Sequence, residues 1–248
     1  NRRMTVQRIH IGMYIDITNQ NMRKNFFHQI NFLFIILIFT TLSSCSDSKD
    51  KNVVRTYWEN GNLKSELRYK DDKLNGECFW YYYNGKPEMK TTYLMDELNG
   101  ETVRWYENGN IQSRYYVVND QYEGVFESYN VYGALVKREH YKKGVLHGSL
   151  TQWYDSGKVF LEGGYNEGMF HGKWMMYYED GAVGSVSDFD NGSGVQKGFA
   201  ADGETLIALI NYRDNVKDGE EIRYNTDGSV KEVLIWNEGE FVEKQLEK

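Results

Sequence analysis

The chain has 248 residues, of which 15% are aromatic, 20 are Tyr, 24 are Gly and one is Pro. This composition favours β-strands joined by glycine turns over helices or disordered linkers. The net charge at pH 7 is −7 for the whole chain and −11 for residues 45–248, because residues 1–44 hold five Lys or Arg and one acidic residue. Nucleic acid and anionic lipid both require a basic protein surface, so this charge argues against either as the main partner.

The first part of the chain has the order of a secretory signal peptide. A basic start at Met22-Arg23-Lys24 precedes an apolar run of thirteen residues from Ile30 to Leu42. This run is shorter than the ~20 apolar residues that cross a bilayer. We therefore expect residues 22–44 to be a signal peptide and residues 1–21 to be a mis-assigned upstream extension. A buried core helix or strand is the alternative for the apolar run.

The segment Leu42-Ser43-Ser44-Cys45 resembles a bacterial lipobox, in which the signal is cut before a Cys that carries a diacylglycerol thioether. The resemblance implies that Cys45 is the first mature residue and that its acyl chains hold the protein at a membrane. The position after Cys45 is Ser46 and not Asp, as in lipoproteins that are sent to an outer membrane. We expect a lipid-anchored protein of the bacterial cell envelope, on the outer rather than the inner membrane, with residues 45–54 as a short linker.

Glycines recur through the rest of the chain with a period of 24 residues, which changes only to 22 and then 25 near the end. The series is Gly61, Gly85, Gly109, Gly133, Gly157, Gly181, Gly203 and Gly228. An aromatic residue stands four positions before each glycine: Tyr57, Tyr81, Trp105, Tyr129, Trp153, Tyr177, Phe199 and Tyr224. A second series predicts a further turn in each unit: Gly76, Gly100, Gly124, Gly148, Gly172, Gly194 and Gly219.

Most glycines of the first series follow Asn or Asp, a pair that favours tight hairpins with positive φ. We predict an all-β fold, an elongated antiparallel β-meander of about eight 24-residue hairpin repeats over residues 55–241, followed by a tail at 242–248. A lone hairpin is marginal in water, so each unit must gain its buried face by pairing with its neighbours. The period shortens in residues 182–198, which we interpret as either a degenerate repeat or a functional insertion.

Several short motifs make the repeat similar to a known family. The segments are W-Y-E-N-G at 105–109, W-Y-D-S-G at 153–157, Y-Y-E-D-G at 177–181, and L-N-G-E at 74–77 and 98–101. They resemble the MORN-repeat variant family, whose bacterial members are often labelled YwqK-family antitoxins. The resemblance implies a MORN-like repeat scaffold, and the label adds toxin neutralisation by a membrane-anchored immunity protein as an alternative function. A purely structural envelope spacer is a third hypothesis.

The sequence holds no motif that would carry catalysis. It has no G-x-S-x-G elbow, phosphate loop or H-E-x-x-H, and no Cys/His pair with an orienting partner, so we predict no enzyme activity and no cofactor. His147 and His171 are one repeat apart, which places them ~9–10 Å apart in a meander, too far to share a zinc ion. Residues 188–192 lack ligands that a calcium loop requires. We therefore predict no metal site.

Two adjacent aromatic positions in each unit suggest a binding surface. We expect the aromatic four before each glycine to pack in the core, and its neighbour, three before the glycine, to point to the opposite face. The candidate binding residues are Trp58, Tyr82, Tyr106, Tyr154 and Tyr178. Such a row suits an unidentified protein or glycan, and packing within the sheet is the alternative. The sequence thus predicts a non-catalytic, lipid-anchored envelope protein that binds one of these partners.

Overall fold

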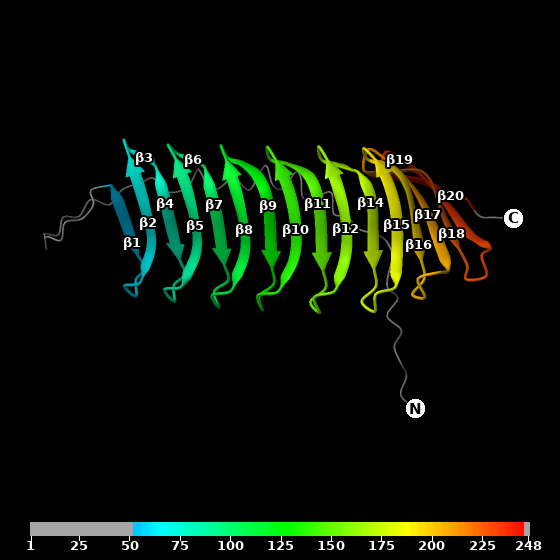
Figure 1. Ribbon diagram of the computed structural model, residues 1–248, viewed down its shortest axis with the longest axis horizontal. Helices are drawn as coiled ribbons and strands as arrows, with labels where there is room; N and C mark the ends of the chain where they lie inside the picture. Colours follow the sequence, from blue (N-terminus) through cyan, green and yellow to red (C-terminus); the bar gives the residue numbers. More distant parts are fainter. Residues whose placement is uncertain (1–51, 246–248) are drawn as a thin grey trace, which may run out of the picture. The chain divides into compact units, whose positions relative to one another are not determined.

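The computed structural model describes residues 52–245, and every regular element in this range is a β-strand (Figure 1). The strands pair antiparallel in chain order within one open sheet of 20 strands, which confirms the predicted all-β meander. Three of these strands, β3, β6 and β13, are two-residue segments that continue into β4, β7 and β14. The described residues contain no helix that is long and apolar enough to cross a membrane.

The strands span most of the described range. They are β1 (Val53–Tyr57), β2 (Leu63–Lys70), β3 (Lys73–Leu74), β4 (Gly76–Tyr81), β5 (Pro87–Leu94), β6 (Glu97–Leu98), β7 (Gly100–Trp105), β8 (Ile111–Val118), β9 (Gln121–Tyr129), β10 (Leu135–Lys142), β11 (Val145–Trp153), β12 (Val159–Asn166), β13 (Met169–Phe170), β14 (Gly172–Tyr177), β15 (Val183–Asp190), β16 (Ser193–Phe199), β17 (Leu206–Arg213), β18 (Val216–Tyr224), β19 (Val230–Asn237) and β20 (Glu240–Gln245).

The eight glycines of the first series occupy hairpin turns along one edge of the sheet, which we call the glycine edge. In the first turn, Gly61 has a φ of 85° and its N–H donates to the carbonyl of Trp58 at 2.9 Å. Asn60 has no positive φ; instead its Oδ1 accepts the N–H of Asn62 at 3.0 Å. This is a type I turn closed by a left-handed glycine, so the glycine alone needs the left-handed conformation.

The two-residue turns lie along the opposite edge, which we call the tight-turn edge. Both turn residues have positive φ there: Asp71-Asp72, Met95-Asp96, Asn119-Asp120, Lys143-Gly144, Glu167-Gly168, Asn191-Gly192, Asp214-Asn215 and Glu238-Gly239. The Asn-Gly and Asp-Gly pairs of the first series thus form hairpin turns as predicted, although only the glycine of each pair has positive φ. Many of the real two-residue turns lack glycine, because Asp and Asn tolerate the left-handed conformation better than other residues do.

All members of the second glycine series except Gly194 mark bulges inside strands rather than turns. Between β2 and its partner the pairing changes from Lys70↔Lys73 to Glu66↔Phe79, so two residues beside Gly76 are extra. Gly76 has a φ of 105°, as a bulge residue without a Cβ can. The hairpin β15–β16 keeps one register from Ser185↔Gly198 to Asp190↔Ser193 and has no bulge.

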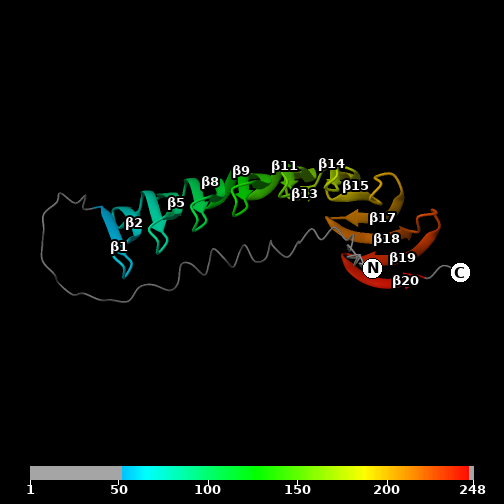
Figure 2. The same ribbon diagram turned by 90° about the horizontal axis from the view of Figure 1, so that it is seen from below.

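The missing bulge explains the irregular spacing of the repeats. Losing its two residues shortens the unit from 24 to 22, so residues 182–198 are a plain hairpin with no insertion. The next turn is one residue longer, because Ala200 N–H donates to Thr205 rather than to a residue four positions on, and the spacing becomes 25. Near this point the strands β17–β20 turn away from the line of the preceding strands (Figure 2).

One face of the sheet holds most of the core, although the strands of residues 52–245 form a single sheet. We call it face 1; its buried side chains include Cys78, Thr91, Val117, Tyr141, Leu150, Leu161, Phe170, Trp174, Phe189, Ile210, Tyr212 and Leu234. The rings pack edge to face along the array, with centroids 4.9 Å apart for Phe170 and Trp174. Burial raises the pKa of Tyr93 and of Tyr115 to about 12. The core therefore lies toward the tight-turn edge of face 1.

Candidate binding surface

The aromatic residues four before each turn glycine lie on the other face of the sheet, face 2, and form a continuous apolar stripe. Each pairs with an aliphatic residue that begins the next strand, such as Trp105↔Ile111 and Tyr129↔Leu135. Paired residues share a face, so aromatic and aliphatic side chains alternate strand by strand. The apolar stripe comprises Tyr57, Leu63, Tyr81, Pro87, Trp105, Ile111, Tyr129, Leu135, Trp153, Val159, Tyr177 and Val183.

The stripe runs straight across the strands. Trp80 pairs with Met89, which pairs with Arg104, so residues 24 apart lie opposite each other across two strands. The same relation holds along β1–β15 (Figure 1). Equivalent rings therefore recur about every 9.4–9.8 Å, twice the spacing of neighbouring strands. Most of these side chains are half-buried, and Tyr57 at the first strand is 61% exposed.

Charged side chains hold two rings of the stripe in place. The Tyr129 hydroxyl donates to Glu127 Oε2 at 2.7 Å, and Arg138 forms a 2.9 Å ion pair with the same carboxylate. Burial by itself would raise the pKa of Glu127, but these two partners outweigh it and the pKa lies below its usual value. The Arg138 guanidinium also lies 5.8 Å from the centre of the Trp153 ring. These charges are paired, which leaves the stripe itself apolar.

The five predicted binding residues begin the turns at the glycine edge and join neighbouring repeats. Each is half-buried and donates to the backbone carbonyl of the aromatic residue that stands four positions before the next turn glycine. The bonds are Trp58 Nε1 to Tyr81 (3.0 Å), Tyr82 Oη to Trp105 (2.6 Å), Tyr106 Oη to Tyr129 (2.9 Å), Tyr154 Oη to Tyr177 (2.8 Å) and Tyr178 Oη to Phe199 (2.8 Å). We call these bonds the aromatic bridges. A ligand-binding role for these residues stays a prediction.

These bridging rings lie on the face opposite to the stripe, as the alternation of strand side chains predicts. The Lys64 ammonium lies 4.4 Å from the Trp58 ring centre, and the Phe160 ring lies 5.1 Å from that of Tyr154. Lys64 and Phe160 are the extra residues of one-residue bulges next to the turns. The bridging rings are therefore partly covered by side chains of their own hairpins.

Contrary to our expectation from the sequence, the aromatic residues four before each glycine do not form the buried core. Trp105 and Trp153 are half-buried on the stripe, whereas the row eight residues after the glycines holds three buried side chains, Val117, Tyr141 and Phe189. The aliphatic half of the stripe was missed by sequence reasoning. Its signal is an apolar residue two positions after six consecutive glycines: Leu63, Pro87, Ile111, Leu135, Val159 and Val183.

Acidic side chains border the stripe along the glycine edge. The turns along the stripe hold the carboxylates of Glu59, Glu107, Asp155, Glu179 and Asp180, and two basic residues, Lys86 and Lys158. Both ammonium groups donate to turn carbonyls of the next repeat, at 2.7 Å from Asn108 and 2.7 Å from Glu179. The border of the stripe at the glycine edge is therefore acidic, and its two cations are engaged. On the other side of the stripe, Arg55, Lys90, Arg114 and Arg138 each form an ion pair with a glutamate.

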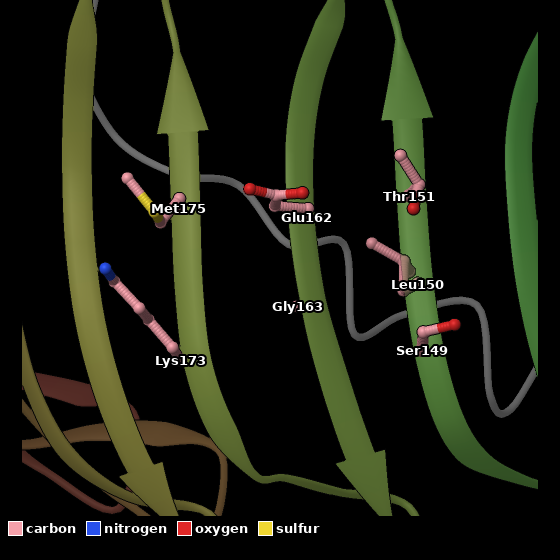
Figure 3. A pocket seen from close by; sticks show the side chains of 7 residues that line it. All are labelled: Ser149, Leu150, Thr151, Glu162, Gly163, Lys173 and Met175. Atoms are coloured by element: carbon pink, nitrogen blue, oxygen red, sulfur yellow. The ribbon is translucent and has the colours of Figure 1, made fainter.

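Two shallow hollows lie among the strands next to the stripe. One, of about 220 Å³, lies over β11, β12 and β14 and is lined by Ser149, Leu150, Thr151, Glu162, Gly163, Lys173 and Met175 (Figure 3). The other, of about 590 Å³, lies around Arg114, the exposed Tyr116 and the bulge at Gly124. Across residues 52–245 no three His, Cys, Asp or Glu side chains gather closely enough to hold a metal ion. Cys45, the predicted lipidation site, lies outside the described residues.

Comparison with known families identifies the first repeats. Residues 52–71, 74–94 and 98–119 match the family described as MORN repeat variant. No curated protein shows significant similarity to the chain. The resemblance to MORN repeat variants is thus confirmed for residues 52–119, which span β1–β8 and the first half of the stripe.

Proposed function

We propose that the protein is a non-catalytic, lipid-anchored envelope protein that binds a protein or glycan partner through the apolar stripe of face 2. The observation that carries this proposal is the continuity of the stripe from Tyr57 to Val183 beside a core confined mainly to face 1. Contiguous apolar surface rimmed by polar residues is typical of interaction sites. Repeat arrays use such extended surfaces to bind partners, which agrees with the MORN repeat variants at residues 52–119.

The chemistry of the stripe suits adhesion better than catalysis. Its side chains are aromatic and aliphatic, and the nearby carboxylates of Glu127 and Glu162 accept hydrogen bonds from Tyr129 and Tyr177. Paired carboxylates of this kind position rings and do not present a free base to a substrate. The arrangement therefore supports binding by surface complementarity.

The membrane anchor is proposed from the lipobox-like sequence that ends at Cys45. In a bacterial host, the wild-type protein should carry a diacylglycerol thioether at Cys45 and partition into the detergent phase. Cys45→Ala should abolish both properties. Mass spectrometry of the mature N-terminus provides the measurement, and an unmodified Cys45 in the wild-type protein would refute the anchor.

Photo-cross-linking tests which face binds. A photoreactive amino acid at Leu135, on the stripe, should capture the partner in the native cells, whereas the same residue at the neighbouring Val136 should not. Val136 is the matched control because it is also aliphatic and half-buried, and its bulge position corresponds to Lys64 and Phe160 beside the bridging rings. Capture from position 136 and not from 135 would show that the binding face is face 1.

A further inference from the structure

We infer that the apolar stripe recognises a basic peptide segment in the polyproline II conformation, which lies across the strands along the array. This inference rests on the proposed function, because it names the partner chemistry of the same surface. Three observations carry it: the spacing of the rings, the alternation of aromatic and aliphatic side chains, and the acidic border of the stripe.

The spacing of the rings fits one turn of a polyproline II helix. This helix has three residues per turn and a rise of about 3.1 Å, so it repeats every ~9.3 Å. The stripe presents an equivalent ring about every 9.4–9.8 Å. Every third residue of such a segment would therefore meet the same environment in each successive repeat, from Tyr57 to Tyr177.

Other regular conformations do not keep this register. An extended strand returns a side chain to the same side every ~6.6–6.8 Å, which drifts by about 3 Å at each repeat. Two turns of an α-helix span about 10.8 Å, which drifts by about 1.0–1.4 Å at each ring and by a whole helical turn over five repeats. Only the polyproline II repeat stays in phase over five repeats, because its mismatch is a few tenths of an ångström per turn.

The side chains of the stripe are of the kind that such segments use. Proline-rich segments dock on aromatic-lined surfaces, where the ring faces pack against the pyrrolidine rings. Here the aliphatic residues between the aromatics, such as Ile111 between Trp105 and Tyr129, close the gaps between successive rings. The result is a row of shallow apolar notches, one for each turn of the ligand.

The charge of the border selects a basic ligand. The turns that flank the stripe hold five carboxylates and two lysines, and both lysines donate to turn carbonyls. With three residues per turn, one side of a polyproline II helix can face this border along its whole length. A basic residue at every third position would therefore lie beside the carboxylates while the prolines contact the stripe.

Titration of the purified mature protein with synthetic peptides tests the inference. The probe is a peptide of five Pro-Pro-Lys triplets, and its binding is followed by the tryptophan fluorescence of the protein, to which Trp105 and Trp153 of the stripe contribute. This peptide should bind at least about tenfold more tightly than two control peptides. Five Pro-Pro-Glu triplets keep the helix but lack the basic charge, and five Gly-Gly-Lys triplets keep the charge but lack the preformed helix. The affinity of the Pro-Pro-Lys peptide should fall as salt screens the border.

Two triple variants with the same change in charge provide the control. Glu59→Gln, Glu107→Gln and Glu179→Gln together remove three carboxylates at the glycine edge and should weaken binding of the Pro-Pro-Lys peptide about fivefold, a modest effect because exposed pairs are weak. Glu97→Gln, Glu167→Gln and Glu238→Gln remove three carboxylates at the tight-turn edge and should leave the affinity unchanged.

Clear outcomes overturn the inference. Equal binding of the Pro-Pro-Glu or Gly-Gly-Lys peptide, an equal loss in both triple variants, or binding of neutral β-linked oligosaccharides with no peptide binding would each contradict it. A failed peptide titration together with cross-linking of a protein at position 135 would sink this inference while the proposed binding face stands. Cross-linking at position 136 alone would overturn both.

Discussion

Five repeats hold two neighbouring aromatic residues, which have different environments because the strand places them on opposite faces. In the third repeat Trp105 lies on the apolar stripe of face 2, while Tyr106 begins the turn and donates to the carbonyl of Tyr129 at 2.9 Å. The backbone carbonyl of Trp105 accepts the aromatic bridge from Tyr82, and the side chain of Tyr106 donates the next one. Loss of the hydroxyl should affect stability without changing the stripe.

Removal of one bridging hydroxyl tests this division. Tyr106→Phe should lower the free energy of unfolding by about 0.5–1.5 kcal/mol, the net contribution of one hydrogen bond. Tyr132→Phe is the control, since Tyr132 is 86% exposed in the adjacent turn and should show no measurable change. Urea unfolding of the two variants makes the comparison. Equal stability of both variants would show that the bridge adds nothing to the fold.

Gly163 shows why some glycines are required without any special backbone angle. It lies opposite Leu150 on face 1, and a Cβ at this position would collide with the ring of Trp174. Trp174 is 2% exposed, and its Nε1 donates to the carbonyl of Gly164 at 3.0 Å. The glycine therefore makes room for the largest buried side chain of the core.

A double-mutant cycle measures this packing. Gly163→Ala should destabilise the protein by about 1–3 kcal/mol, as overpacking of a core does. In a Trp174→Leu background the same change should cost much less, because the ring that it would meet is gone. Thermal unfolding of the four proteins gives the coupling. Equal losses in both backgrounds would mean that Gly163 does not serve the Trp174 ring.

At the level of elements, the last hairpins contain a buried charge network. Glu221 on β18 is 2% exposed and lies 2.7 Å from both Lys217 Nζ and Arg223 Nε. Burial alone would raise the pKa of Glu221, yet these two cations outweigh it and the pKa lies below its usual value. The folded state thus favours the ionised carboxylate.

This lowered pKa predicts acid sensitivity of the C-terminal hairpins. The stabilisation is present above the ordinary Glu pKa of about 4.3 and is lost as the pH falls through the lower folded value. Between about pH 5 and pH 3 the melting temperature of the wild-type protein should therefore fall more steeply than that of Glu221→Gln. Glu220→Gln, at an exposed neighbour, should keep the wild-type slope. Parallel slopes for all three proteins would refute the network.

Sequence periodicity predicts the repeat, its turns and the opposite faces of adjacent aromatics such as Trp105 and Tyr106. It does not predict which aromatic row is buried, because both rows recur with the same period and burial depends on how neighbouring rings cover one another. Periodicity also predicts turns at the second glycine series. A glycine such as Gly76 indicates positive φ, but turns and bulges both require it, so the sequence does not distinguish them. The aromatic bridges link residues one repeat apart, which no local pattern reveals.

At the level of the whole molecule, both edges are joined from repeat to repeat. At the glycine edge the aromatic bridges connect successive turns, and at the tight-turn edge backbone bonds do so, such as Gly168 N–H to Leu146 at 2.8 Å. Among the described residues, each hairpin therefore contacts nearby hairpins. The stripe is continuous because equivalent hairpins stack side by side in chain order. Stability should then depend on position in the array.

The central claim is that the protein is an open array of hairpins, each held by its neighbours, and two matched turn substitutions test it directly. Gly109 (φ 100°) joins β7 to β8 in the middle, and Gly228 (φ 84°) joins β18 to β19 near the end. A valine is strained at either angle. Hydrogen exchange with thermal unfolding should show Gly109→Val weakening protection across the array, with a lower main melting temperature. Gly228→Val should expose only β18–β20 and leave the main transition in place. Equal loss of stability and protection throughout the sheet in both variants would contradict the open array and indicate a single, globally cooperative unit.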